Sequence, residues 1–249
     1  MNEDRFTGKA EIYNKYRPSY PEEFIDYLYH ELGFSKSSVI ADIGSGTGIF
    51  SRLLLSRGST VYCVEPNCEM RQIAEDALSC YEGFISINAN ANNTTLENSS
   101  VDFVTAAQSF HWFDKESFKT ECKRILKSGK KTALIWNERD YESELVKKDY
   151  IIREKYAADD KKGLGPSRIN HTGFFKDDKF DFKIFSNDLV LDREAYIGMN
   201  LSRSYSPKKD TDPEFYRGFV HDLGELFDIY SKGSILIFPH FMQSYIGEI

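Results

Sequence analysis

The chain has 249 residues, of which 41% are hydrophobic, so it can hold one α/β domain with a sizeable core and an added segment. Its 32 Lys and Arg stand against 39 Asp and Glu, a net charge of −7 without any basic run, so a nucleic-acid substrate is not expected. The sequence shows neither an export signal nor an apolar run of membrane-spanning length, which leads us to expect a cytoplasmic protein without a membrane partner.

Residues that bind metals or form disulfides are dispersed along the chain. The five histidines form no cluster with cysteines or carboxylates at ligand spacing, so we predict no metal site. The cysteines lack a C-x-x-C pair and fall on predicted strand or helix positions, where we expect them to be reduced and packed. The four are Cys63, Cys68, Cys80 and Cys122.

The first clear element is the stretch Val39–Phe50, where a short apolar run leads into alternating glycines and an amphipathic segment. This order predicts a buried strand, a tight turn and the crossover helix of a βαβ unit. Glycine permits positive φ and lets a ligand approach the main chain without a Cβ in the way. We therefore predict a ligand-binding turn with the carboxylate of Asp42 at its rim. The turn residues are Gly44, Ser45, Gly46 and Gly48.

Two classes of ligand use such a turn, and the spacing of the glycines separates them. The dinucleotide fingerprint is G-x-G-x-x-G, whereas this chain has G-x-G-x-G, with Ile49 where the third glycine of the fingerprint would fall. A pyrophosphate remains possible, because a helix N-terminus favours anions. The acidic Asp42 instead favours a cationic neighbour.

The next predicted strand, Thr60–Pro66, is β-branched and apolar up to the carboxylate of Glu65 near its end. At the tip of a second parallel strand, Glu65 can accept hydrogen bonds from both ribose hydroxyls of an adenosine. Helical spacing then predicts a helix over Asn67–Leu78. A short strand, Phe84–Ile87, and a polar Asn-rich loop over residues 88–95 follow.

Strand and helix continue to alternate through the first half of the chain. Because the carboxyl ends of neighbouring parallel strands meet, we expect Asp42, Glu65 and Gln108 to lie together at one edge of the sheet. The further elements predicted here are a strand over Val101–Ala107, a helix over Glu116–Leu126 and a strand over Lys131–Trp136.

The second half shows core-like periodicity without a recognisable functional pattern. Residues 142–156 are charged and helical, and the Gly- and Pro-containing break after them predicts an insertion or lid. The remaining expected elements are a strand over Phe180–Leu191, helices over Arg193–Leu201 and Glu214–Tyr230, and strand character around Ile235–Phe238 that Pro239 places at an edge or bulge.

The stretch Asp42–Gly48 resembles the first motif of class I S-adenosylmethionine-dependent methyltransferases, whose cofactor carries an ammonium and a sulfonium. The segments Tyr13–Pro21, Gln108–Phe113 and Leu134–Asp140 resemble the small-molecule branch called type 11, near the trans-aconitate and related carboxyl methyltransferases. The likeness is close in the first half and weak from Glu142 onward.

The resemblance implies an α/β fold with a Rossmann-like, mostly parallel seven-stranded sheet, an antiparallel last strand and helices on both faces. It also implies lid elements at the N-terminus and after the fifth strand. The expected organisation is a single domain over 1–249, with an N-terminal cap over 1–36, a cofactor-binding core over 37–140, an insertion or lid over 141–178 and a part completing the sheet over 179–249.

S-adenosylmethionine is the cofactor that the resemblance implies, with Glu65 on its ribose and Asn92 near the adenine amino group. An N-terminal helix would fold over it, where Arg17 either pairs with a carboxylate or is a solvated charge. The implied cofactor residues are Asp42, Gly44, Ser45, Gly46, Gly48, Glu65, Pro66, Ala91, Asn92 and Gln108. The implied lid or substrate residues are Tyr13, Tyr16, Arg17, Tyr20, His111 and Trp112.

We expect an enzyme that methylates an oxygen of a small-molecule acceptor, in a carboxylate or a hydroxyl. A carboxylate is already ionised at neutral pH, whereas a hydroxyl needs a base. The chain lacks the Asn/Asp-Pro-Pro-Tyr/Phe sequence that marks methylation of planar nitrogens in resembling families. His111 is the catalytic candidate, as a base or as a donor to a substrate carboxylate, although a histidine among aromatic residues can instead be structural.

Two other functions remain open at this point. A nicotinamide-dependent oxidoreductase is disfavoured by Ile49 in place of the third glycine of the fingerprint. A non-catalytic module that binds S-adenosylmethionine would keep the same turn and carboxylates. The sequence leaves the acceptor, the oligomeric state and the retention of turnover undecided.

Overall fold

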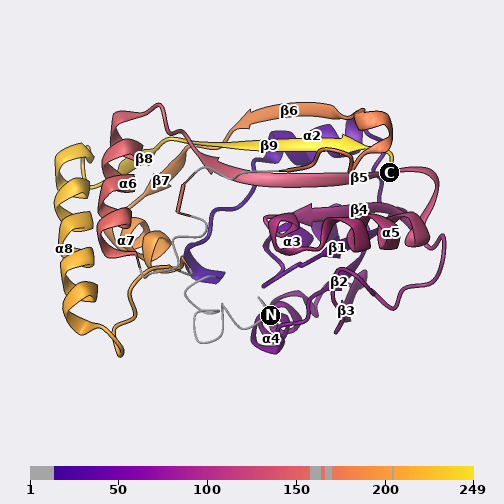
Figure 1. Ribbon diagram of the computed structural model, residues 1–249, viewed down its shortest axis with the longest axis horizontal. Coiled ribbons are helices and arrows are strands. Elements are labelled where there is room, and N and C mark those ends of the chain that lie inside the picture. Colours follow the sequence, from indigo (N-terminus) through magenta and orange to yellow (C-terminus); the bar gives the residue numbers. More distant parts are fainter. Residues whose placement is uncertain (1–13, 158–163, 166–169, 204) are drawn as a thin grey trace.

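A seven-stranded sheet forms the centre of the protein (Figure 1). The computed structural model describes residues 14–157, 164–165, 170–203 and 205–249. In spatial order the strands are β3 (Phe84–Ile87), β2 (Thr60–Val64), β1 (Val39–Ile43), β4 (Val101–Ala107), β5 (Leu126–Arg139), β9 (His240–Gly247) and β6 (Asp181–Ser186). The strands β1 to β5 are parallel, and β9 lies antiparallel between β5 and β6. The predicted α/β fold with an antiparallel last strand is confirmed.

Helices cover both faces of this sheet, because successive side chains of each inner strand point to opposite faces. Ile40 packs on one face with residues of three helices, and Ala41 packs on the other face with residues of a fourth. Both faces of β1 are therefore buried and apolar, as expected of a parallel sheet. The helices on the Ile40 face are α2 (Glu22–His30), α3 (Ile49–Ser56) and α4 (Cys68–Leu78), and the helix on the Ala41 face is α5 (Lys115–Ile125).

The boundaries of β5 differ from the predicted strand. The chain pairs with β4 as soon as α5 ends, through Leu126 opposite Val101, and the register then shifts before Lys131 pairs with Phe103. Gly129 lies between these pairs with φ +71, a conformation that glycine adopts without strain. The strand therefore begins five residues earlier than the apolar run that predicts it. The predicted strands Phe84–Ile87 and Val101–Ala107 are confirmed at their observed bounds.

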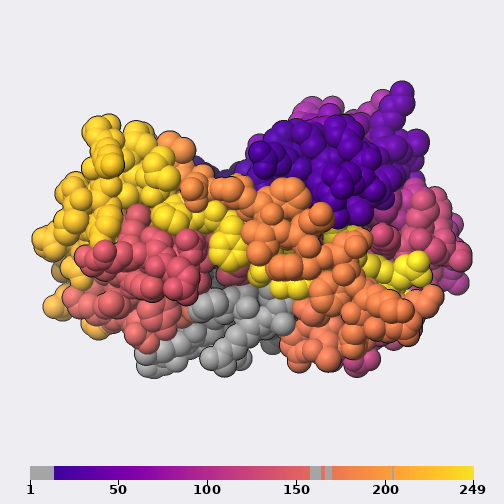
Figure 2. All heavy atoms as spheres, turned by 90° about the horizontal axis from the view of Figure 1, so that it is seen from above, coloured from indigo at the N-terminus to yellow at the C-terminus, as the bar shows by residue number. Residues whose placement is uncertain are grey.

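A helical lobe lies beside the sheet domain, at the left of Figure 1. It has its own apolar core, in which Val146, Tyr196, Phe219 and Phe238 are buried together. Figure 2 shows the surface hollowed between this lobe and the N-terminal part of the sheet domain. The elements of the lobe are α6 (Glu144–Tyr156), α7 (Arg193–Leu201), α8 (Pro213–Tyr230), and a two-stranded sheet of β7 (Leu189–Leu191) and β8 (Leu236–Phe238).

The stretch Phe180–Leu191 is two strands rather than the single strand predicted. β6 closes the large sheet, whereas β7 belongs to the lobe. The break falls at Asn187 and Asp188, where the Asn187 N–H donates to the backbone oxygen of His240 and Oδ1 of Asp188 accepts from the His240 N–H. These contacts turn the chain out of the sheet, although its apolar alternation continues.

Pro239 likewise lies between two strands of different sheets, β8 and β9. Among the described strands, β8 pairs only with β7 and is an edge strand, as the proline predicts, but β9 lies inside the large sheet.

All four cysteines are free. The prediction that they are packed is right for Cys63 and Cys122, which are buried, and wrong for Cys68 and Cys80, which are exposed. None of the helices in the described ranges combines the length and the apolar character that crossing a membrane requires.

Candidate active site

A cavity of about 490 Å³ opens at the carboxyl ends of β1, β2 and β4. It extends from the glycine turn after β1 to Arg203, which follows α7 of the helical lobe. Ligands of open α/β sheets bind at this edge, where the strand order changes direction. The predicted site residues that line the cavity are Arg17, Tyr20, Asp42, Gly44, Ser45, Gly46, Glu65, Pro66, Ala91, Asn92, Gln108 and Trp112.

The three glycines of the turn all have positive φ, but their surroundings differ. A Cβ added to Gly46 would meet only Met70 Sδ, at 3.8 Å, so the main chain there is open to the cavity. A Cβ on Gly48 would lie 2.5 Å from Leu78 Cδ1, and Gly48 does not line the cavity. Gly46 therefore offers a surface to a ligand, whereas Gly48 lets α3 pack closely against α4.

Asp42 lies beneath the turn, with 1% of its surface exposed, and not at the rim as predicted. Its Oδ2 accepts a 2.6 Å hydrogen bond from Ser51 Oγ, and its Oδ1 accepts a 2.8 Å bond from Thr105 Oγ1. These two hydroxyls, on α3 and β4, hold the side chain inward. Burial raises the pKa of Asp42 to about 6, although both hydroxyls act to lower it. The carboxyl still lines the cavity, where a cation would favour its ionised form.

Glu65 follows β2 and connects two loops through its carboxylate. Oε2 accepts from the Gly46 N–H and Oε1 from the Asn67 N–H, each at 2.9 Å. Burial raises the pKa of Glu65, and the two N–H donors act to lower it. A carboxylate has further lone pairs, so Glu65 can also accept from the hydroxyls of a ligand.

The N-terminal segment contributes Arg17 and Tyr20 to the cavity, but Tyr16 lies elsewhere. The Tyr16 hydroxyl donates a 2.6 Å hydrogen bond to Glu194 Oε1 of α7, and its ring lies against Gly198. Tyr16 therefore joins this segment to the helical lobe. Tyr13 lies outside the described residues.

His111 does not line the cavity, although its neighbour Trp112 does. Both belong to a short 3-10 helix, η1 (Phe110–Trp112). The Trp136 Nε1–H donates to His111 Nδ1 at 3.4 Å, which favours the neutral imidazole. His111 is exposed as a residue, but desolvation of its ring and the charge of Arg17 lower its pKa to about 4. A nitrogen that accepts from Trp136 is a weak base near neutral pH.

Sequence reasoning missed three polar residues at the far end of the cavity, Asn137, Arg203 and His240. Asn137 and Arg139 are alternate residues of β5, and His240 pairs with Arg139. The side chains of Asn137, Arg139 and His240 therefore point to one face of the sheet. The Asn137 Nδ2–H donates to the Ser19 oxygen at 3.1 Å, which holds the N-terminal segment over this face. Asn137 lies within the segment Leu134–Asp140, but no sequence pattern links it to Arg203 or His240.

Comparisons with known proteins agree with this architecture. Residues 41–134 match the family model described as methyltransferase domain. An uncharacterized methyltransferase of Mycobacterium tuberculosis is 35% identical over 135 residues, 54% of this chain and 53% of that protein. An uncharacterized methyltransferase of Schizosaccharomyces pombe is 33% identical over 155 residues, 60% and 59% of the two chains. The chain thus spans about half the length of the curated relatives it matches.

Solved structures extend the likeness to nearly the whole chain. A protein of Anaeromyxobacter dehalogenans described as a type II methyltransferase aligns with a TM-score of 0.63 at 19% identity, over 93% of this chain and 97% of that one. A protein of Anabaena variabilis described as a methyltransferase from an antibiotic biosynthesis pathway aligns with a TM-score of 0.60 at 21% identity, over 90% and 96%. At these identities the likeness shows the fold. Residues 41–134 therefore resemble a methyltransferase domain, and the sheet order and the glycine turn agree with that resemblance.

Proposed function

We propose that this protein transfers the methyl group of S-adenosylmethionine to an oxygen of a small-molecule acceptor, a carboxylate or a hydroxyl. The observation that carries the proposal is the composition of this cavity. One end has the open main chain of Gly46 and the carboxylates of Asp42 and Glu65, and the other end has the guanidinium groups of Arg17 and Arg203.

The first end fits the cofactor by its chemistry. The main chain of Gly46 is open to a ligand, and the Glu65 carboxylate, which lines the cavity, can accept from ribose hydroxyls. The buried Asp42, whose pKa is raised to about 6, would be stabilised in its ionised form by a nearby ammonium. When bound, S-adenosylmethionine would supply an electrophilic methyl group on its sulfonium.

The second end fits an anionic acceptor. Arg17 and Arg203 place positive charge at the cavity, and guanidinium groups bind carboxylates through paired N–H donors. A carboxylate oxygen is ionised at neutral pH and needs no base, so these residues have only to hold it in line with the methyl group and exclude water. A hydroxyl acceptor would need a base, and His111 is poorly placed for that role because Trp136 occupies its Nδ1.

The alternatives make different predictions about ligands. Calorimetric titration with S-adenosylhomocysteine, with NAD as the control ligand, tests the cofactor. Binding of the former alone is expected, and binding of NAD alone would contradict the proposal. Transfer of a labelled methyl group from S-adenosylmethionine into small carboxylic acids then tests turnover. A protein that binds the cofactor and methylates no acid or alcohol in a broad panel would instead be a binding module.

A further inference from the structure

His240 is held at the far end of the cavity by its backbone, while its side chain faces the cavity. It is the first residue of β9 and is 3% exposed. Its N–H donates to Asp188 Oδ1 and its carbonyl oxygen accepts from the Asn187 N–H, each at 3.0 Å. Among the described residues, neither Nδ1 nor Nε2 of the imidazole has a hydrogen-bond partner. Buried polar atoms are rarely left in this state, so a ligand in the cavity is a natural partner for them.

The surroundings of His240 are strongly cationic. Arg139 faces it across the β5–β9 pair, Arg203 approaches from the segment after α7, and Arg17 approaches from the N-terminal segment. Desolvation and then these three charges hold the pKa of His240 well below its usual range. The carboxylate of Asp188 accepts from the backbone N–H of His240, close to the same site.

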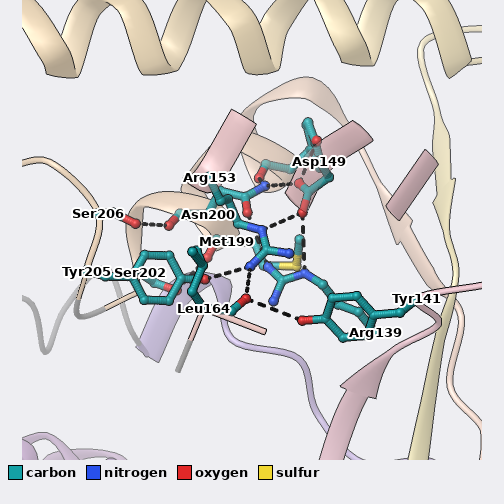
Figure 3. Close-up of polar contacts among 11 residues, drawn as sticks. Arg139, Tyr141, Asp149, Arg153, Leu164, Met199, Asn200, Ser202, Tyr205 and Ser206 are labelled. Atoms are coloured by element: carbon teal, nitrogen blue, oxygen red, sulfur yellow. Dashed lines mark hydrogen bonds and ion pairs between the residues drawn. The ribbon is translucent and has the colours of Figure 1, made fainter. Parts of the chain in front are cut away.

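The buried carboxylate of Asp149 does not cancel this charge, because it is shared between two arginines (Figure 3). Asp149 Oδ2 accepts from Arg153 Nε at 2.6 Å and lies 3.6 Å from Arg139 Nε. Its Oδ1 accepts from Tyr196 and Asn200. Asn200 Oδ1 in turn accepts from Arg139 Nη2 at 3.2 Å. Arg139 is thereby fixed beside His240, and Arg17 and Arg203 line the cavity.

We propose that His240 is an acceptor-binding residue that donates a hydrogen bond to a negatively charged oxygen of the methyl acceptor and takes up one proton when that oxygen binds. This inference rests on the proposed function, because it places the acceptor at the end of the cavity opposite the cofactor residues. An anion among Arg17, Arg139 and Arg203 offsets the charges that keep the imidazole neutral, so protonation becomes favourable. The proton comes from solvent, so one N–H bond forms on the imidazole as an O–H bond of a solvent hydronium breaks.

Histidine ring-nitrogen NMR on the full chain saturated with S-adenosylhomocysteine tests the proposal, with succinate as the probe. At pH 7.5 both succinate carboxylates are ionised. The His240 nitrogens, assigned through His240→Gln, are expected to show a neutral imidazole without succinate and an imidazolium with it. A His240 signal that does not respond to bound succinate would overturn the proposal, and the variant serves only to assign that signal.

Affinity measurements provide the second test. His240→Gln is expected to weaken succinate binding at least about tenfold while S-adenosylhomocysteine affinity stays within about twofold, the size of effect that a lost hydrogen bond to a charged group produces. The matched control is His221→Gln, an α8 histidine with a 69% exposed side chain, which should change neither affinity. Failure of succinate to bind protein that does bind S-adenosylhomocysteine would overturn the role of His240 alone. Failure to bind S-adenosylhomocysteine would overturn the proposed function instead.

Discussion

The N–H of Gly46 donates a 2.9 Å hydrogen bond to Oε2 of Glu65, so the glycine turn after β1 and the carboxylate after β2 are joined within the protein itself. The second oxygen of the same carboxylate accepts from the Asn67 N–H at the start of α4. One side chain therefore holds two loops in position around the open main chain of Gly46. The proposed cofactor end of the cavity is in this sense already organised.

Glu65→Gln should weaken S-adenosylhomocysteine binding by at least about tenfold, because hydrogen bonds to charged groups contribute about 1.5–3 kcal/mol each. The glutamine also places an NH₂ group against one of the two N–H donors that the carboxylate accepts from. Calorimetric titration measures the change, with Glu97→Gln, an exposed site away from the cavity, as the matched control. Equal affinities for the two variants would show that Glu65 does not contact the ligand.

Both Gly46 and Gly48 have positive φ, so a side chain at either should lower stability, but only a side chain at 46 should also block the ligand. Gly46→Val should remove S-adenosylhomocysteine binding, because its side chain enters the cavity next to Met70. Gly48→Ala should mainly lower the melting temperature, because the new Cβ meets Leu78 and a left-handed conformation costs a non-glycine residue about 1–2 kcal/mol. Thermal unfolding and ligand titration on both variants check this division. Normal affinity in a folded Gly46→Val protein would contradict it.

Asp42 should make the unliganded protein less stable as the pH rises. Its folded pKa of about 6 is above its usual 3.8, so the folded state retains the proton that the unfolded state loses between these values. The contribution of Asp42 to the free energy of unfolding is unchanged below pH 4 and declines between pH 4 and 6. Above pH 6 it is lower by about 3 kcal/mol. Asp42→Asn removes this pH-dependent loss of stability, because asparagine does not ionise.

Urea unfolding at pH 4.5 and pH 8 measures this effect as a difference between the two proteins. The Asp42→Asn variant should gain stability relative to the parent protein as the pH rises, while losing affinity for S-adenosylhomocysteine. A difference in stability that is the same at both pH values would mean that Asp42 ionises normally in the folded protein.

His111→Ala should destabilise the fold more than it slows methyl transfer. It leaves the Nε1–H of the fully buried Trp136 without an acceptor, which costs about 1–3 kcal/mol. Turnover should fall far less than the roughly 100-fold expected when a general base is removed. His111→Gln, whose side-chain oxygen can accept from Trp136, should restore stability. A 100-fold slower His111→Ala enzyme with normal cofactor affinity would restore the catalytic role.

Asp149→Asn should loosen the helical lobe from the sheet. Burial acts to raise the pKa of Asp149, but Arg153 and Arg139 keep it below its usual value, so the group is ionised and its loss leaves two buried guanidiniums without their shared carboxylate. Breaking a buried pair in this way costs about 3–5 kcal/mol. Urea unfolding should show this loss, whereas Asp222→Asn, which breaks an ion pair with the exposed Lys155, should show a much smaller one. Similar losses would mean that Asp149 does not anchor the lobe.

The sequence by itself determined the sheet half of the protein, because its signals are local. Short apolar runs bounded by turn residues define β1 to β4, and the alternating glycines with Asp42 and Glu65 mark the edge where the cavity opens. In a parallel sheet the right-handed crossover rule converts this order along the chain into a place in space. The confirmed fold class follows from these features, and so does the match of residues 41–134 to a methyltransferase domain.

Only the tertiary structure decided how the second half is used. The alternation through Phe180–Leu191 continues across the point where the chain leaves one sheet for another, because backbone contacts with His240 turn it there. Asp42 is held beneath the turn by Ser51 of the following helix and by Thr105, and His111 is held by Trp136, and both Thr105 and Trp136 are distant in sequence from the residues they hold. Arg203 and His240 carry no local signal for a site, since they meet at the cavity only when the helical lobe packs beside the sheet.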